Sequence, residues 1–211
     1  MNQKNSTITQ GETIQLPTKY GHFKLIPFQE NLNGVEHIAL IKGDFKLNEI
    51  VFTRIHSACA TGDLFGSLKC DCGEQLIEAM KMIETIGKGV IVYLQQEGRG
   101  IGLMNKVKAY KLQEQGFDTL EANLHLGFAA DERNYKIGAE ILIAIGVNKV
   151  KLITNNPEKI NGLEQYGVEV VNRIPLLIKS NKFNKDYLNT KEIRMGHLLN
   201  EEEQEYQCYD N

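Results

Sequence analysis

The chain has 211 residues and a formal net charge of −3, so it lacks the broad positive field with which proteins bind nucleic acid. A chain of this length can bury an ordinary hydrophobic core without disulfides or a structural metal. The first residues are polar and no segment has the apolar length of a membrane span, so we expect a cytoplasmic protein with no membrane partner.

β-Branched, aromatic and helically spaced apolar residues predict an alternation of strands and helices. In chain order, we predict strands at 22–28, 36–43 and 50–57, a helix at 73–86, a strand at 90–94, helices at 103–115 and 134–145, a strand at 149–154, a helix at 157–166, a strand at 168–174 and a last helix at 186–199.

This pattern indicates one layered α/β domain with a mixed sheet flanked by helices. An α+β arrangement is the alternative, because the first half reads as antiparallel or mixed. We expect a flexible N-terminus at 1–14, the folded domain at 15–199 and an acidic, flexible tail at 200–211.

Three of the four cysteines lie within one short segment, as Cys59, Cys70 and Cys72. In a reducing compartment, clustered thiols point to a metal or to catalysis before disulfides. Three thiolates leave a tetrahedral zinc shell incomplete, so the site is catalytic unless His56 closes the shell. Cys208 is a poorer fourth ligand because it lies in the acidic tail. The alternative is that the cysteines are small buried hydrophobes.

A glycine-rich segment, QQEGRGIGL, follows the predicted strand at 90–94. Its glycines do not have the G-x-G-x-x-G spacing, so we reject a nicotinamide site. Glycines at a helix N-terminus can still let backbone N–H groups approach a phosphate. A plain strand-to-helix turn would explain the glycines but not the Glu97 and Arg99 between them.

Two further segments carry charge at the start of predicted helices. In FAADERNY, Asp131 and its acidic neighbour could simply balance a helix dipole. In TNNPEK, the residues lie at the carboxyl end of a buried strand, where open α/β sheets bind ligands. A capped helix start, with Asn156 before Pro157, is the alternative there.

Taken together, the chain resembles GTP cyclohydrolase II, the zinc enzyme that opens the guanine ring at the start of riboflavin synthesis. The resemblance runs from about Leu16 to Leu199 and is carried by RIHSACATGDLFGSLKCDCG, QQEGRGIGL, DTLEAN, GFAADERNY and LITNNPEK. It implies the family's fold, a catalytic domain at 15–199 and a homodimer. It also implies GTP as substrate, formate and pyrophosphate as products, one Zn²⁺ per subunit and Mg²⁺ with the GTP phosphates.

The resemblance also implies roles for single residues. Cys59, Cys70 and Cys72 match the zinc ligands, which leaves His56 outside the shell. Asp131 matches a proton acceptor, Arg133 a residue acting at the α-phosphate and Tyr110 a tyrosine near the base. Positions implied to hold GTP are Arg54, Ile55, His56, Ser57, Ala58, Gln75, Glu97, Gly98, Arg99, Thr119, Thr154 and Lys159.

The chemistry of the side chains favours some of these roles over others. A guanidinium stays protonated near neutrality, so Arg133 suits charge stabilisation better than nucleophilic attack. Glu97 suits the two donors on the guanine edge and would reject adenine. Tyr110 could instead be a core residue. Ala58 departs from the family, in which many members have an acidic or polar residue at this position.

Two rival functions remain at this point. A sister enzyme could share the ring-opening chemistry but differ in substrate or product. A non-catalytic nucleotide-binding module could use zinc only to hold a loop against a helix. That module predicts a closed zinc shell with His56 as the fourth ligand.

Overall fold

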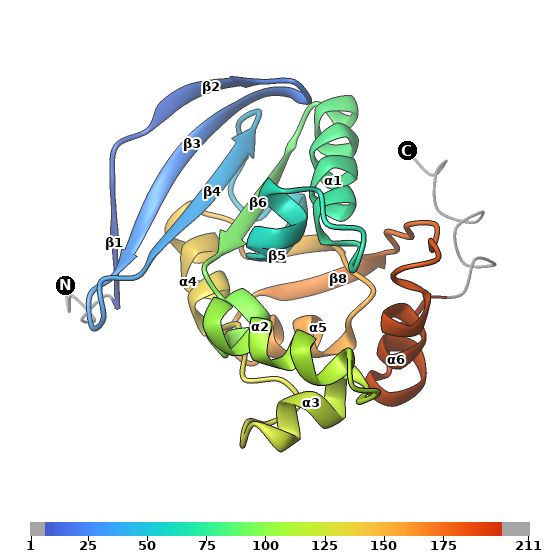
Figure 1. Ribbon diagram of the computed structural model, residues 1–211. Helices are drawn as coiled ribbons and strands as arrows, with labels where there is room; N and C mark the ends of the chain where they lie inside the picture. Colours follow the sequence, from blue (N-terminus) through green and yellow to red (C-terminus); the bar gives the residue numbers. More distant parts are fainter. Residues whose placement is uncertain (1–6, 200–211) are drawn as a thin grey trace.

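Eight strands form a single sheet in the computed structural model, which describes residues 7–199 (Figure 1). The strands are β1 (Ile8–Gln10), β2 (Ile14–Thr18), β3 (Gly21–Glu30), β4 (Glu36–Lys42), β5 (Ile50–Ser57), β6 (Gly89–Leu94), β7 (Lys149–Ile153) and β8 (Glu169–Ile174). Their order across the sheet is β1-β3-β4-β6-β5-β7-β8, with β2 also paired to β3.

The sheet has an antiparallel and a parallel half. Strands β1 and β2 pair antiparallel with β3, which pairs antiparallel with β4, and β4 does the same with β6. Strands β6, β5, β7 and β8 are parallel neighbours. The predicted mixed sheet in one α/β domain is therefore confirmed. Because parallel strands end at the same edge, the carboxyl ends of β5, β6 and β7 lie together.

Helices cover both faces of this sheet (Figure 1). The α-helices are α1 (Cys72–Ile86), α2 (Gly102–Gln113), α3 (Thr119–His125), α4 (Lys136–Ala144), α5 (Pro157–Glu164) and α6 (Lys185–Met195). A π-helical turn, η1 (Ala60–Leu64), follows β5, and a short 3₁₀ segment, η2 (Glu97–Gly100), follows β6.

Two hydrophobic clusters hold the layers together. On one face of the sheet, Val92 packs with Ile141 of α4 and Leu163 of α5. On the other face, Ile91 packs with Ile83 of α1. Adjacent residues of β6 point to opposite faces and both are fully buried, as expected for a strand covered by helices on both sides.

The structure contains elements that the sequence analysis missed. Strand β1 lies inside the segment 1–14 that we expected to be flexible, because Ile8 is buried in the core and β1 pairs with β3. Residues 1–6 and the tail 200–211 lie outside the described residues. Strand β2 contains Pro17, which obscured its pattern.

Helix α3 was also missed, although its start carries a recognisable signal. Asp118 accepts hydrogen bonds from the backbone of Leu120 and Glu121, and Glu121 bonds back to the backbone of Asp118. This capping box was legible in the sequence as D-x-x-E. Helix α6 ends at Met195 rather than at 199, because Gly196 adopts a left-handed conformation with φ of 65°.

No helix within residues 7–199 has the length and apolar character needed to cross a membrane.

Candidate functional site

The predicted site residues converge on one pocket, at the edge where β5, β6 and β7 end. All of them line this pocket except Ile55 and Asp131. The Ile55 side chain lies in the core, and Asp131 is bonded to Arg133, which does line the pocket. The pocket has a cysteine end and a cationic end. The cysteine end comprises Cys59, Cys70, Cys72, Glu97 and Lys106, and the cationic end comprises Arg54, Arg99, Arg133, Lys159 and Lys191.

The three cysteine sulfurs at the cysteine end lie within 4.8 Å of one another. Cys59 precedes η1 and Cys72 begins α1, so two helical turns bring the thiols together. Gly62 makes room for them, because a Cβ at this position would lie 2.9 Å from the Cys70 sulfur. Thiolates converging in this way are typical ligands of Zn²⁺. The cluster therefore fits a metal ion, and simple hydrophobic packing does not require such convergence.

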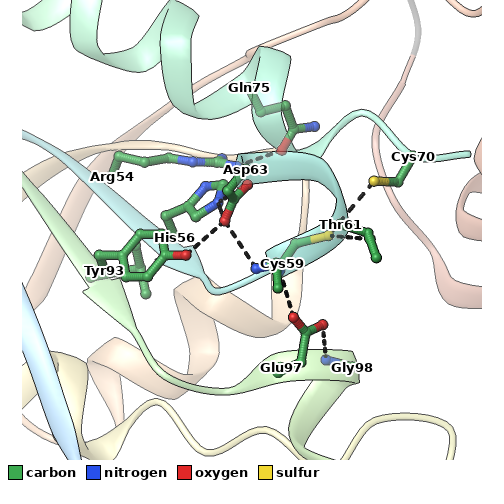
Figure 2. Close-up of polar contacts among 12 residues, drawn as sticks. Arg54, His56, Cys59, Thr61, Asp63, Cys70, Gln75, Tyr93, Glu97 and Gly98 are labelled. Carbon is green, nitrogen blue, oxygen red and sulfur yellow. Dashed lines mark hydrogen bonds and ion pairs between the residues drawn. The ribbon is translucent and has the colours of Figure 1, made fainter. Parts of the chain in front are cut away.

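His56 does not join the cysteines. Among residues 7–199, the group with metal-ligand spacing consists of Cys59, Cys70 and Cys72. The His56 ring stacks on Tyr93 at 5.4 Å between centroids, and its Nε2 lies 3.2 Å from both carboxylate oxygens of Asp63 (Figure 2). The alternative in which His56 closes a zinc shell is therefore wrong for this arrangement.

Asp63 connects this histidine to the cysteine end, and the sequence analysis missed it. Its carboxylate accepts hydrogen bonds from the Cys59 backbone N–H and from the Tyr93 hydroxyl, both at 2.9 Å (Figure 2). Burial lowers the pKa of His56, which favours the neutral ring. Asp63 therefore holds the backbone of the first cysteine in place.

Lys106 of α2 was also missed, and it links the thiols to Glu97. Its Nζ lies 3.0 Å from the Cys59 sulfur and 2.7 Å from a Glu97 carboxylate oxygen. Burial alone would lower the pKa of Lys106, but the hydrogen bonds to Glu97 and Cys59 outweigh it and raise the pKa. No sequence pattern reveals this contact, because it depends on how α2 packs against the cysteine loop.

The thiols and the neighbouring lysine shift one another's pKa values in different directions. Hydrogen bonds from Cys70 and Cys72, and then the charge of Lys106, lower the pKa of Cys59. The hydrogen bond to Cys59 raises the pKa of Cys70 to about 11 and that of Cys72 still further above its usual range. Cys59, next to the Lys106 ammonium group, is therefore the thiol that loses its proton most readily, and binding of a divalent cation would favour deprotonation of all three.

Glu97 is held rigidly by the protein. One carboxylate oxygen accepts from the Ala60 N–H at 2.5 Å, and the other accepts from the Gly98 N–H at 2.8 Å as well as from Lys106. A carboxylate offers about four acceptor positions, so one is left for a ligand. Gly98 and Arg99 both adopt left-handed backbone conformations, with φ of 63° and 62°. Arg99 is thus a strained non-glycine residue at a candidate site.

At the cationic end, charges are buried close together. The Arg54 side chain donates to the Ile153 carbonyl at 2.9 Å and to Gln75, and Lys159 donates to the Ile55 carbonyl at 2.7 Å. Burial lowers the pKa of Arg54 to about 10. Burial, followed by the charges of neighbouring cations, lowers the pKa of Lys159 well below its usual range. Burial and mutual repulsion therefore disfavour these cations, and a bound anion would stabilise them.

Several hydrogen-bond donors at the cationic end are unused. The Nε of Arg54 and both terminal nitrogens of Arg99 are buried without a partner among residues 7–199. Most buried polar groups in proteins are bonded, so a set of free guanidinium donors in one pocket indicates an anionic ligand.

Asp131 and Arg133 form an ion pair in the loop before α4. Asp131 accepts from the Arg133 backbone N–H at 3.0 Å and from its Nε at 2.8 Å. Burial raises the pKa of Asp131, but Arg133 outweighs burial and the net shift is downward. Because α4 begins only at Lys136, Asp131 is outside its first turn, and the helix-dipole interpretation is wrong.

The family model described as GTP cyclohydrolase II matches residues 9–175. The chain belongs to the GTP cyclohydrolase II family. The riboflavin biosynthesis protein RibBA of Parabacteroides distasonis is 61% identical over 194 residues, which are 92% of this chain and 48% of that protein. RibBA of Phocaeicola vulgatus is 59% identical over 197 residues, or 93% of this chain and 49% of the relative. The chain thus spans about half the length of these relatives.

A crystal structure of RibBX, a two-domain 3,4-dihydroxy-2-butanone 4-phosphate synthase from A. baumannii, matches 81% of this chain and 41% of its own, with 24% identity and a TM-score of 0.46.

In this GTP cyclohydrolase II family member, Tyr110 is not a core residue. Its ring lies 5.1 Å from the Lys69 ammonium and 5.8 Å from that of Lys106, at the pocket wall. Burial raises the pKa of Tyr110, so it is a neutral hydroxyl at physiological pH. Thr154 accepts from the Asn156 N–H at 3.0 Å, and Thr119 is the first residue of α3.

Two predicted positions at the end of β5 behave differently. The Ser57 hydroxyl is buried and without a partner among the described residues, so it is free to contact a ligand. Ala58 donates its backbone N–H to Leu94 at 2.7 Å, which fixes the ends of β5 and β6 together. This contact uses the backbone of Ala58, so it does not depend on the side chain at this position.

Helix α6 supplies pocket residues that lie beyond the family match. Tyr187, Lys191 and the nearby His197 line the pocket. The sequence analysis predicted the helix but gave these side chains no role, because nothing in a single amphipathic helix shows which face reaches a distant site.

Proposed function

We propose that the chain is a zinc-dependent GTP cyclohydrolase II. It would convert GTP and water to 2,5-diamino-6-(5-phosphoribosylamino)pyrimidin-4(3H)-one, formate and pyrophosphate. The observation that carries this proposal is the pairing, in one pocket, of three converging cysteine sulfurs with a group of buried cations. Ring opening needs an activated water at one end of the nucleotide, and the triphosphate needs positive charge at the other.

Cys59, Cys70 and Cys72 would hold the zinc ion. When bound, zinc supplies a Lewis acid that makes water nucleophilic near neutral pH. Lys106 partly neutralises the thiolates through its contact with Cys59. Mg²⁺ would accompany the phosphate oxygens, which it binds without a dedicated protein cage.

Glu97 is the candidate for reading the guanine edge. Its remaining acceptor position can take a donor of the base, and its other hydrogen bonds hold it still. A site built to accept from guanine leaves this carboxylate unpaired with adenine, which would make discrimination strong. Tyr110, as a neutral hydroxyl, can donate near the base.

The cationic end would bind the triphosphate. Arg54 and Arg99 have unused donors there, and Arg133 and Lys159 add charge. Guanidinium groups suit phosphate because they present several donors in a plane. Gln75 would position Arg54, to which its side-chain oxygen is bonded. His56, Ser57, Thr119 and Thr154 would add neutral contacts.

Arg133 would first bind the α-phosphate, and Asp131 would then accept a proton. Burial opposes the charge of Arg133, but Tyr135 and Asp131 raise its pKa, so it stays a cation and stabilises charge at the α-phosphate rather than acting as a nucleophile. While paired with Arg133, Asp131 is a weak base, because its pKa is lowered. Engagement of Arg133 by the phosphate would free Asp131 to accept a proton.

We further propose a homodimer in the cytoplasm, where free thiols stay reduced. Supporting the dimer, Leu64, Phe65 and Met104 are 74%, 81% and 77% exposed on η1, the loop after it and α2. Such apolar exposure is typical of an interface. We expect Phe65→Asp with Met104→Asp to give a monomer by light scattering, and Leu32→Asp, at an exposed turn, to leave the dimer intact. A monomeric parent protein would contradict this.

The enzyme assignment is tested by incubating zinc-loaded protein with GTP and Mg²⁺ and measuring formate, pyrophosphate and the mass of the base-containing product. Release of both small products, with the expected pyrimidinone, supports the assignment. Pyrophosphate without formate would favour a sister enzyme. Binding of GTP without either product would contradict the enzyme assignment and favour a non-catalytic nucleotide-binding module.

A further inference from the structure

Helix α6 forms one wall of the pocket, although it lies beyond the family match at residues 9–175. Figure 1 shows α6 next to α3. The two helices are joined by an ion pair from Arg194 to Asp118 and by a 3.3 Å contact from Arg194 to Glu121. Contacts that lie outside the pocket therefore hold α6 in place at the pocket wall.

Lys191 carries the charge of α6 into the pocket. It is only 8% exposed, and its Nζ lies 2.7 Å from an oxygen of Asp71. The other Asp71 oxygen accepts from Gln75 at 2.6 Å, and Gln75 in turn accepts from Arg54. A continuous chain of polar contacts thus runs from α6 to a guanidinium at the cationic end.

Asp71 is the central member of that chain and lies between two metal-ligating candidates. Cys70 and Cys72 are its sequence neighbours, and Asp71 precedes the first turn of α1. A lysine that fixes Asp71 therefore also fixes Gln75, the glutamine that holds Arg54. Loss of this contact would leave a carboxylate that is 3% exposed without its cation.

Tyr187 packs between two cations of the pocket. Its ring centroid lies 4.4 Å from the Lys191 ammonium and 5.9 Å from the Arg99 guanidinium. Aromatic faces attract cations, so the ring of Tyr187 stabilises both Lys191 and Arg99 at the pocket. Among residues 7–199, the cations of this end form ion pairs with two carboxylates, Lys191 with Asp71 and Arg133 with Asp131, which leaves an excess of positive charge suited to a polyanion.

We propose that α6 completes the substrate pocket and that Lys191 is a positioning residue for the phosphate chain of the nucleotide. It holds Asp71, and through Gln75 the guanidinium of Arg54, in the arrangement that phosphate requires. It also adds its own charge to the cationic end. This inference rests on the proposed function, since it specifies which further residues bind the triphosphate.

The test uses full-length, zinc-loaded protein and inorganic tripolyphosphate, which probes the cationic end without the base. Calorimetry gives its dissociation constant for the parent protein, Lys191→Gln and Lys191→Arg. Lys185→Gln is the matched control, because Lys185 is an exposed residue of the same helix. Zinc content and unfolding temperature are measured for each, and GTP turnover gives KM and kcat.

We expect Lys191→Gln to weaken tripolyphosphate binding and raise KM for GTP at least tenfold, with zinc content retained. Lys191→Arg should recover most of the affinity, and Lys185→Gln should match the parent. If Lys191→Gln does not fold, Tyr187→Leu replaces it and should weaken tripolyphosphate severalfold. Parental affinity in the folded variant, or zinc loss equal to the affinity loss, would overturn the inference.

The two proposals fail differently. A parent protein that turns over GTP while Lys191→Gln behaves identically would overturn only the role of α6. A parent protein that binds neither GTP nor tripolyphosphate would overturn the proposed function and this inference together.

Discussion

The cysteine end and the cationic end of the pocket are built in opposite ways. The cysteine end takes its three sulfurs from 14 residues of continuous chain, Cys59 to Cys72, folded by η1 and the start of α1. The cationic end gathers Arg54 from β5, Arg99 from η2, Lys159 from α5 and Lys191 from α6. Local folding of one segment therefore brings the three sulfurs together, whereas the cations come together only when the whole domain has folded.

The two ends also differ in how the protein balances their charges. At the cysteine end, Lys106 and hydrogen bonds between the thiols compensate one thiolate charge. At the cationic end, buried cations lie close together, and guanidinium donors of Arg54 and Arg99 have no partner among residues 7–199. Removal of a metal should therefore change the cysteine end modestly, whereas anion binding should change the protonation of the cationic end.

The largest effect is expected from removing a thiol. Cys70→Ser replaces a soft ligand in a cluster of three, so we expect loss of bound zinc and of formate release. Zinc is measured by mass spectrometry of the metal and formate by a coupled assay. The fourth cysteine provides the control, since Cys208→Ser should keep both. Stoichiometric zinc and normal turnover in Cys70→Ser would show that the cysteine end is not the metal site.

Next in size is the loss of Arg133. Arg133→Met removes a charge-stabilising donor near the α-phosphate, and we expect kcat to fall by about 10²–10³-fold. Lys81→Met, which removes an exposed charge from α1, should leave kcat unchanged. If Arg133→Met affected only KM, the residue would be a binding group rather than one acting in the transition state.

A smaller effect is expected for Lys106, which links Cys59 to Glu97 within the cysteine end. Lys106→Met removes the N–H contact to Cys59 and leaves Glu97 short of a partner, so zinc affinity should fall by about 10–100-fold. Competition with a zinc chelator measures this. Lys108→Met, exposed on the same helix, should have parental affinity. An unchanged zinc affinity in Lys106→Met would separate the lysine from the metal site.

The smallest expected effect is the uptake of a fraction of a proton when GTP binds. The pKa of Lys159 is lowered by burial and by neighbouring cations, and a bound phosphate chain would raise it. Binding of GTP should therefore take up protons at pH values between the pKa of Lys159 in the free protein and its higher pKa in the complex, and affinity should rise as pH falls through that range. Calorimetry in two buffers of different ionisation enthalpy measures the uptake, which Lys159→Met should abolish. Proton release on binding in the parent protein would contradict the proposed charge balance.

The sequence allowed prediction of features that depend on neighbouring residues. The order of strands and helices from 22 onward, apart from α3, follows from local patterns, as do the cysteine cluster and the cap at Asn156. Strand β1 was missed because a three-residue strand is defined by its partner β3 rather than by its own composition. Helix α3 was missed although its capping box was present.

Other parts of the site could not be predicted because they depend on packing. Lys106 reaches Cys59 across 47 residues of sequence, and Lys191 reaches Asp71 across 120. Their charges look like ordinary solvated lysines on amphipathic helices until the helices are placed. Asp63 was equally hidden, because its role comes from contacts with His56 and Tyr93 that only the fold creates.

The central claim is that one nucleotide spans the two ends of this pocket. A crystal structure of the zinc-loaded protein with a non-hydrolysable GTP analogue tests it most directly. Our account predicts the guanine ring at the cysteine end, beside Glu97, and the triphosphate against Arg54, Arg133 and Lys159. Phosphates at the cysteines with the base elsewhere, or an analogue bound outside this pocket, would contradict it.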